Sequence, residues 1–183
     1  MEAGLMIRRH LERATAMPIG PGLGCEPETM ALVADLVQEA KGPLVLDADA
    51  LQPELVKLGS APRVLTPHQG EFERIAKGAS LEEFGRMEPT VTVLKGPVTR
   101  IVNGEVIYYG IHGGPMLARG GSGDMLAGLI GGRLAAQPSE LVIAAAQGVV
   151  WHGLAAQWVA ERRGETAVRT TEILSALNPV LRA

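Results

Sequence analysis

Residues 42–51, GPLVLDADAL, join a short apolar run to an end rich in carboxylates. The apolar letters PLVL follow a glycine, and Asp47 and Asp49 come directly after them. A short continuous apolar run beside turn residues is typical of a strand that is buried on both faces of a parallel sheet. We therefore predict a buried strand here, with Asp47 and Asp49 at its carboxyl end.

The same pattern occurs in other parts of the chain. ATAMPIG (14–20) leads into the glycine turn GPGLG, and RVLTP (63–67) and TVTVLKG (90–96) are further short apolar runs with polar ends. TRIVNG and EVIYYG, joined at Asn103-Gly104, predict a β-hairpin, because Asn-Gly readily adopts the positive φ angles of a two-residue turn.

Helical segments separate and follow these strands. The first, 27–41, begins with a proline, which suits a first helical position. Strands that alternate with helices predict an α/β fold, with a mostly parallel central sheet flanked by helices on both faces and a helical C-terminal half. We expect one domain over residues 1–183. The helices are expected at 27–41, 69–78, about 122–136, about 139–163 and about 169–177.

Composition excludes several classes of protein. A net charge of −3, mixed charge signs and 3% aromatic residues disfavour nucleic-acid binding. The single cysteine, Cys25, excludes an internal disulfide and a multi-cysteine metal site, and it favours a reducing compartment, with the cytoplasm as the expected location. The N-terminus has no apolar core typical of a signal peptide. The apolar segment 139–163 carries Gln147, His152 and Gln157, which favours a buried helix over a membrane span.

Polar side chains follow each predicted strand, where ligands bind in open parallel sheets. Thr66, His68 and Glu71 follow one strand, and Lys95 and Gly96 follow another. Each group alone also fits an ordinary loop: aspartates are common in turns, and the glycines at 20–24 can simply form a tight turn. Together with the strand end at Asp47 and Asp49 and the GGSGD turn that precedes a helix, these make four polar strand or helix ends, which favour a cleft.

The stretch GGSGD, residues 120–124, directly precedes an apolar helix. Consecutive glycines can present backbone N–H groups into one concavity, and the helix N-terminus adds its positive dipole, so the stretch predicts an anion site suited to phosphate. Asp124 then lies where it can accept a proton from a hydroxyl that attacks a phosphoryl group. The alternative is that Ser122 caps the helix and Asp124 decorates its first turn.

Glycine continues inside this helix at Gly128, Gly131 and Gly132. Each such glycine costs about 1 kcal/mol relative to alanine, which suggests that another group approaches the backbone closely. Familiar nucleotide signatures are absent: the chain has no GxxxxGK[ST], and Cys25 stands where a dinucleotide fingerprint would have its third glycine. No spacing fits a zinc site or a kinase catalytic loop.

The ordered set IGPGLG, PLVLDADAL, LTPHQGE, VLKGPVT and ARGGSGDMLAG resembles the ADP/ATP-dependent NAD(P)H-hydrate dehydratases of the ribokinase-like superfamily. The resemblance runs from about residue 14 to the C-terminus and includes WHGLAAQ. It implies a repair reaction, in which the hydroxyl on the hydrated nicotinamide ring of NADH or NADPH is phosphorylated and loss of phosphate restores the reduced cofactor.

The resemblance also implies roles for individual residues. Asp124 would be the catalytic base and would contact the substrate, as would Gly22 and His68. Glu71 would organise Mg²⁺ through water, and Asp47 is a further candidate near the metal, while ADP or ATP would be the phosphoryl donor. The nucleotide would be bound by the KG loop and the glycine stretch, namely Lys95, Gly96, Pro97, Val98, Thr99, Gly120, Gly121, Ser122 and Gly123.

Some features depart from the family pattern. The pattern usually has threonine or serine in place of Arg119, often asparagine in place of Gly114 and commonly proline in place of Gln69. Arg119 could add positive charge at the phosphates. Roughly the first third of the family's domain is also missing, so we expect an exposed sheet edge. A neighbouring subunit, a partner chain that supplies the missing segment or a rearranged N-terminus around LMIRRHL would cover it.

Two other functions remain open at this point. The chain could be a kinase for a small alcohol, such as a sugar or vitamin precursor, because the same base and anion site serve any hydroxyl acceptor. It could also be a catalytically impaired nucleotide-binding module. By resemblance, the expected assembly is a homo-oligomer, with the tetramer as the common form among bacterial relatives.

Overall fold

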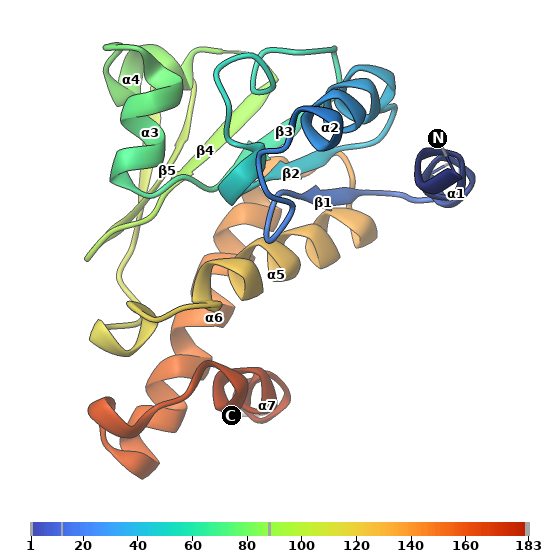
Figure 1. The fold of residues 1–183 in the computed structure, drawn as a ribbon. Coiled ribbons are helices and arrows are strands. Elements are labelled where there is room, and N and C mark those ends of the chain that lie inside the picture. Colours follow the sequence, from blue (N-terminus) through green and yellow to red (C-terminus); the bar gives the residue numbers. More distant parts are fainter. Residues whose placement is uncertain (1, 12, 88, 182–183) are drawn as a thin grey trace.

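A six-stranded sheet in the order β1-β2-β3-β4-β5-β6 forms the centre of the computed structural model (Figure 1). The structure describes residues 2–11, 13–87 and 89–181. Strands β1 to β4 are parallel, and β5 and β6 continue the sheet in antiparallel orientation. The mostly parallel sheet is therefore confirmed. The strands are β1 (Met17–Ile19), β2 (Leu44–Leu46), β3 (Arg63–Leu65), β4 (Thr90–Leu94), β5 (Thr99–Asn103) and β6 (Val106–Gly110).

Helices cover both faces of the sheet. The predicted helices at 27–41, 69–78, 122–136 and 139–163 are confirmed within a few residues, the usual uncertainty of helix ends. The helices are α1 (Glu2–Leu11), α2 (Pro27–Glu39), α3 (Gln69–Ala76), α4 (Leu81–Gly85), α5 (Ser122–Ala136), α6 (Leu141–Arg163) and α7 (Thr170–Val180), with short 3₁₀ turns η1 (Ala48–Ala50), η2 (Pro115–Leu117) and η3 (Glu165–Ala167).

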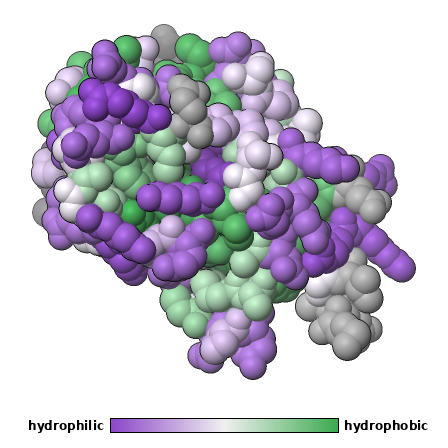
Figure 2. All heavy atoms as spheres, turned by 90° about the horizontal axis from the view of Figure 1, so that it is seen from above, coloured by the Kyte–Doolittle hydropathy of each residue, from purple (hydrophilic) through white to green (hydrophobic). Residues whose placement is uncertain are grey.

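Alternate side chains of the strands enter two separate hydrophobic cores. Leu44 and Leu46 of β2 join the core under α2, α3 and α4, whereas Val45 joins the core against α5 and α6. This follows from the two-residue period of a strand. Seen from above, on the side of α2, α3 and α4, hydrophilic side chains spread over much of the outer surface (Figure 2). The central strands β2, β3 and β4 are thus buried between two helical layers.

The C-terminal half of α6 extends beyond the sheet and packs against α7 (Figure 1). Ala155, Ala156 and Val159 of α6 form a third core with Ile173 and Ala176 of α7. In the described part of the chain, no helix is long and apolar enough to cross a bilayer.

Of the three glycines for which a close approach was predicted, Gly128, Gly131 and Gly132, one meets a close neighbour. A Cβ on Gly131 would lie 2.3 Å from Cγ of Pro18 in β1, so this glycine lets α5 approach the sheet. Gly128 and Gly132 have no such neighbour within 4 Å among the described residues. The expected close approach is confirmed for Gly131 alone.

The structure corrects two boundaries. Asn103 pairs with Val106 as the last residue of β5, so the hairpin turn is Gly104-Glu105, and Gly104 alone has a positive φ of 60°. Helix α7 does not stop before Pro179 but runs to Val180. Proline removes one backbone donor, and in the last turn of a helix this loss does not interrupt a following turn.

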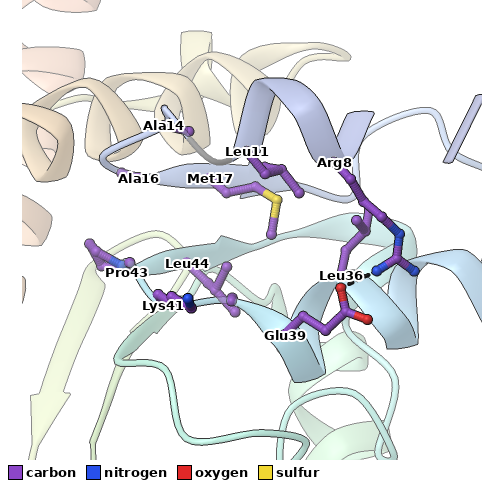
Figure 3. Close-up of a pocket in the computed structure, with 12 residues that line it drawn as sticks. Arg8, Leu11, Ala14, Ala16, Met17, Leu36, Glu39, Lys41, Pro43 and Leu44 are labelled. Carbon is purple, nitrogen blue, oxygen red and sulfur yellow. Dashed lines mark hydrogen bonds and ion pairs between the residues drawn. The ribbon is translucent and has the colours of Figure 1, made fainter. Parts of the chain in front are cut away.

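Strand β1 lies at one edge of the sheet, and α1, which sequence reasoning did not predict as a helix, lies beside it (Figure 3). Arg8 of α1 donates hydrogen bonds to Glu39 and Asp35 of α2. A cavity of about 580 Å³ separates α1 from β1, β2 and the end of α2. The N-terminal helix therefore flanks this edge and leaves a cavity next to it.

Candidate functional site

The parallel strands bring their polar ends together at one edge of the sheet. Lys95, directly after β4, donates its backbone N–H to the carbonyl of Pro67 after β3, at 2.8 Å, and Lys95 also forms a β-bridge with His68. Asp47 directly follows β2, the neighbour of β3. Residues far apart in the chain therefore meet where the strand pattern predicted.

An ion pair between Lys95 and Asp47 forms the centre of this cluster. Lys95 Nζ lies 2.8 Å from Asp47 Oδ1 and 3.9 Å from Glu71 Oε2, and the Asp47 side chain is only 1% exposed. Gly20 packs on the backbone of Asp47: it has φ +135°, and a Cβ there would lie 1.7 Å from the Asp47 carbonyl oxygen. A glycine is therefore required at this position of the GPGLG turn.

Asp49 supports the same turn. Its Oδ2 accepts a hydrogen bond of 2.9 Å from the backbone N–H of Gly24. The two carboxylates of the DAD stretch thus act differently: Asp47 pairs with Lys95, and Asp49 holds the glycine turn.

His68 and Glu71 form a capping box at the start of α3. His68 Nδ1 accepts hydrogen bonds from the N–H groups of Gly70 and Glu71, and Glu71 Oε2 accepts one of 2.7 Å from the N–H of His68. Such reciprocal bonds satisfy orphan donors of the first helical turn. His68 remains largely exposed, whereas Glu71 is directed toward Lys95.

The first turn of α5 lies against this charged cluster. Gly121 precedes the helix with φ +80°, and Ser122 is the first helical residue. A Cβ on Gly123 would lie 3.2 Å from Lys95 Nζ and 3.9 Å from Asp47 Oδ2. The backbone N–H of Ser122 donates a hydrogen bond of 3.2 Å to the carbonyl of Arg119. Those of Gly123 and Asp124, in the first helical turn, have no intrahelical partner and are available beside Lys95.

A cavity of about 550 Å³ opens between the KG loop, the start of α5 and the segment that follows β6. Its size falls in the usual range for a small-molecule site. Seven predicted site residues line it: His68, Lys95, Gly96, Pro97, Thr99, Ser122 and Gly123. The side chain of His68 is largely exposed.

Other predicted residues lie outside the cavity wall. Asp124 and Gly22 are exposed and do not line it, and the same holds for Val98, Gly120 and Gly121. Asp124 nevertheless directly follows Gly123 in the first turn of α5. The cavity and the exposed Asp124 therefore flank the same helix start.

The three positions that depart from the family pattern have distinct environments. Arg119 Nη2 donates a hydrogen bond of 2.7 Å to the carbonyl of Thr166, so its guanidinium is held by the η3 segment. Gln69 is exposed and bonds Glu73 on α3. Gly114 lines the cavity.

Sequence reasoning missed two histidines of the cavity wall, His112 and His152. His152 lies on α6, is 5% exposed, and its Nε2 is 3.3 Å from Ser122 Oγ. Burial lowers the pKa of His152 to about 4, so its ring is neutral at pH 7. A histidine inside an otherwise apolar helix was the available signal.

The residues around Lys95 suit a magnesium–nucleotide complex better than a metal cage. Among the described residues, no group of three or more His, Cys, Asp or Glu side chains could hold a metal ion. Mg²⁺ commonly takes one or two carboxylates, keeps waters and binds substrate phosphates. Glu71 and Asp47 fit that limited role, since both carboxylates face the same position beside the start of α5.

Comparison with known proteins agrees with the motifs. The NAD(P)H-hydrate dehydratase family matches residues 2–179. A bifunctional NAD(P)H-hydrate repair enzyme of Gloeobacter violaceus is 40% identical over 189 aligned residues, which cover 94% of this chain and 36% of that protein. An ADP-dependent (S)-NAD(P)H-hydrate dehydratase of Xanthomonas campestris is 35% identical, with 93% of this chain and 64% of that protein covered.

Solved structures give the same result. The ADP/ATP-dependent NAD(P)H-hydrate dehydratase of Bacillus subtilis, co-crystallised with ATP/Mg²⁺ and soaked with CoA, superposes with a TM-score of 0.81 at 30% identity, over 92% of this chain and 66% of that one. A ribokinase of Thermotoga maritima, 13% identical, shares the fold with a TM-score of 0.56. The chain spans about a third of the bifunctional relatives that it matches. It belongs to the NAD(P)H-hydrate dehydratase family and has a ribokinase-like fold.

Proposed function

We propose that this chain catalyses the nucleotide-dependent dehydration of hydrated NADH or NADPH. The observation that carries the proposal is the contact between the first turn of α5 and Lys95 at the wall of a cavity. Here the backbone N–H groups of Gly123 and Asp124, which have no intrahelical partner, lie beside an ammonium group. This is an arrangement suited to a transferring phosphoryl group. The family and the ADP-dependent relative support the hydrated cofactor as the acceptor.

In the proposed reaction, the ring hydroxyl of the hydrate attacks the terminal phosphorus of ADP or ATP. The hydroxyl proton passes to the Asp124 carboxylate, and the bond between that phosphorus and the bridging oxygen breaks. The phosphate ester then leaves as inorganic phosphate while the neighbouring ring carbon loses a proton, which restores the reduced nicotinamide. Phosphorylation thus converts a poor leaving group into a good one.

The residues of the site have separate roles in this proposal. Asp124 is exposed in the first turn of α5, where a substrate can reach it. The loop from Lys95 to Thr99 and the stretch from Gly120 to Gly123 bind the nucleotide phosphates. Gly22 and His68 contact the hydrated dinucleotide. Glu71 holds Mg²⁺ through water, with Asp47 nearby, and the bound metal supplies charge neutralisation for the polyphosphate.

The test is recovery of reduced nicotinamide absorbance from hydrated NADH or NADPH, with Mg²⁺ and either ADP or ATP. We expect recovery to require a nucleotide and to fall by at least 100-fold in Asp124→Asn, because general base catalysis contributes 10²–10⁴-fold. Asp35→Asn is the matched control, since Asp35 is an exposed aspartate on α2 that forms an ion pair with Arg8 of α1. It is expected to retain full activity.

Two other outcomes would replace the proposal. Phosphorylation of a sugar or vitamin-precursor alcohol without any recovery of the hydrate would identify a small-molecule kinase. Tight nucleotide binding that is unchanged in Asp124→Asn, with no turnover of any acceptor, would identify a nucleotide-binding module. Full activity in Asp124→Asn would show that Asp124 is not the catalytic base.

Assembly and location remain part of the proposal. We propose a homo-oligomer, a tetramer by resemblance, with a partner chain as an alternative source of a segment at the β1 edge. Exposed apolar side chains on and after β6, namely Tyr108, Tyr109 and Ile111, support self-association. Light scattering of the purified chain measures this directly, and a monomer at all concentrations would contradict it. A reducing cytoplasmic location, proposed from the single Cys25, would be tested by fractionation.

A further inference from the structure

The starting observation is a buried polar contact between two helices. His152 of α6 and Ser122 of α5 are both buried, with His152 Nε2 3.3 Å from Ser122 Oγ, and both line the cavity beside Lys95. Burial of an imidazole and a hydroxyl costs free energy unless each group is hydrogen-bonded, as these two are to each other. Because both residues also line the cavity, their contact can act on the site there.

Close packing fixes where His152 stands. One turn before it, a Cβ on Gly148 would lie 2.6 Å from Cγ1 of Ile130 in α5. Directly after it, a Cβ on Gly153 would lie 2.6 Å from the carbonyl carbon of His112. The glycines on either side therefore allow α6 to pack closely against α5 and the cavity wall. This close packing leaves the His152 ring little freedom to move.

The start of α5 lacks the usual means of fixing its own geometry. Its N-cap residue is Gly121, which has no side chain, and no side-chain cap hydrogen bond is formed there. This leaves the N–H groups of Gly123 and Asp124 free for an anion, while the N–H of Ser122 donates to the carbonyl of Arg119. The turn also has no side-chain cap to brace it. Two contacts from other helices brace it instead: Ser122 meets His152, and Thr170 of α7 donates a hydrogen bond of 3.0 Å to the carbonyl of Gly120.

We propose that His152 is a positioning residue, which holds the first turn of α5 through Ser122 and thereby aligns its N–H groups with the nucleotide phosphate. The inference rests on the proposed function and extends it to a residue of the WHGLAAQ segment to which the resemblance assigns no role. His152 acts as a neutral hydrogen-bonding partner and not as a phosphate-binding cation, since burial keeps its ring uncharged at pH 7.

The test compares His152→Leu, His152→Gln, Ser122→Ala and the double variant His152→Leu/Ser122→Ala. ADP affinity is measured by calorimetry, and kcat and KM are measured in the hydrate assay. We expect His152→Leu and Ser122→Ala each to weaken ADP binding and to lower kcat by about tenfold, the effect of one lost hydrogen bond. The KM for the hydrated cofactor should change less than ADP affinity, because Gly22 and His68, its other proposed contacts, lie outside the first turn of α5. His152→Gln keeps a donor and an acceptor and should restore most of both quantities.

The double variant separates a shared role from two independent ones. If His152 acts through Ser122, the double variant loses no more than either single variant. Gln147→Leu is the matched control: Gln147 accepts a hydrogen bond of 2.7 Å from Arg133, a second α5–α6 contact at the far end of α5. It should leave ADP affinity and kcat unchanged.

Three results would overturn the inference: multiplicative losses in the double variant, failure of His152→Gln to restore binding, or wild-type ADP affinity in a folded Ser122→Ala. Ser122→Ala also covers the case in which His152→Leu does not fold. ADP affinity does not depend on turnover of the hydrate. If the wild-type chain repairs no hydrate but the variants still lose ADP affinity, the positioning role stands and the proposed reaction is rejected.

Discussion

The buried neutral ring of His152 makes the stability of this protein depend on pH. In the folded chain burial lowers the pKa of His152 from the model-peptide value of 6.5 to about 4. The unfolded chain therefore binds a proton between these two values, whereas the folded chain does not. By linkage, the folded state has its full stability with respect to this group above pH 6.5. Part of the free energy of unfolding is then lost as the pH falls toward 4.

The magnitude follows from the two pKa values. A difference of one pKa unit corresponds to about 1.4 kcal/mol, so the full loss below pH 4 is about 3 kcal/mol. At pH 5 most of the unfolded chains and few of the folded chains are protonated at this site, which gives a loss of about 2 kcal/mol relative to pH 7.5. That is a large part of the 5–15 kcal/mol typical of a folded domain.

Urea unfolding at pH 7.5 and at pH 5 measures this effect. His152→Gln cannot titrate, so its free energy of unfolding should fall by about 2 kcal/mol less than that of the wild type between the two pH values. All carboxylates are present in both proteins, and their contribution cancels in the comparison. His112→Gln is the control for loss of a histidine, because His112 lies on the same cavity wall but is exposed. If wild type and His152→Gln lose equal stability, His152 is not a buried neutral ring.

Two further predictions use matched pairs of substitutions and the same unfolding assay. Gly131→Ala should destabilise the chain by about 1–2 kcal/mol because its Cβ would lie 2.3 Å from a neighbouring side chain, whereas Gly132→Ala, in open space, should stabilise it by about 0.5–1 kcal/mol. Destabilisation by both would contradict the packing described for α5. Lys95→Met should cost about 3–5 kcal/mol because it leaves the buried carboxylate of Asp47 unpaired, whereas Lys77→Met, at an exposed pair 4.0 Å long, should change stability by less than about 1 kcal/mol. Equal effects at the two lysines would show that Asp47 is better solvated than its burial indicates.

The sequence predicted the sheet and the long helices because their patterns are local. Apolar runs with polar ends at 42–51, 63–67 and 90–96 identify buried strands, and the parallel order of strands then brings their carboxyl ends together. The errors lie at the ends of elements, where the chain has more than one suitable local conformation. The hairpin turn shifted by one residue, from Asn103-Gly104 to Gly104-Glu105, because a single positive φ at Gly104 is sufficient.

The site was harder to predict, because its contacts depend on how separate elements pack. The glycine stretch and the KG loop were visible as motifs, but nothing in their letters shows that Gly123 faces Lys95 or that Asp47 pairs with it. His152 lies 30 positions from Ser122 along the chain, and their contact depends on the angle between α5 and α6. A resemblance to a family transfers motif residues, whereas a partner on another helix requires the structure.

The charges around Lys95 bear on how an anion can bind there. One ammonium group faces two carboxylates, those of Asp47 and Glu71, so the cluster carries a formal charge of −1 when all three groups are ionised. Lys95 alone is therefore a weak attractor for a polyphosphate, since its charge is already compensated. Two other sources of positive potential remain at this place: the free N–H groups at the start of α5, and a metal ion that arrives with the nucleotide. The direction of the N–H dipoles is set by the backbone of α5. The alignment of the first turn of α5 is therefore the feature on which phosphate binding chiefly depends.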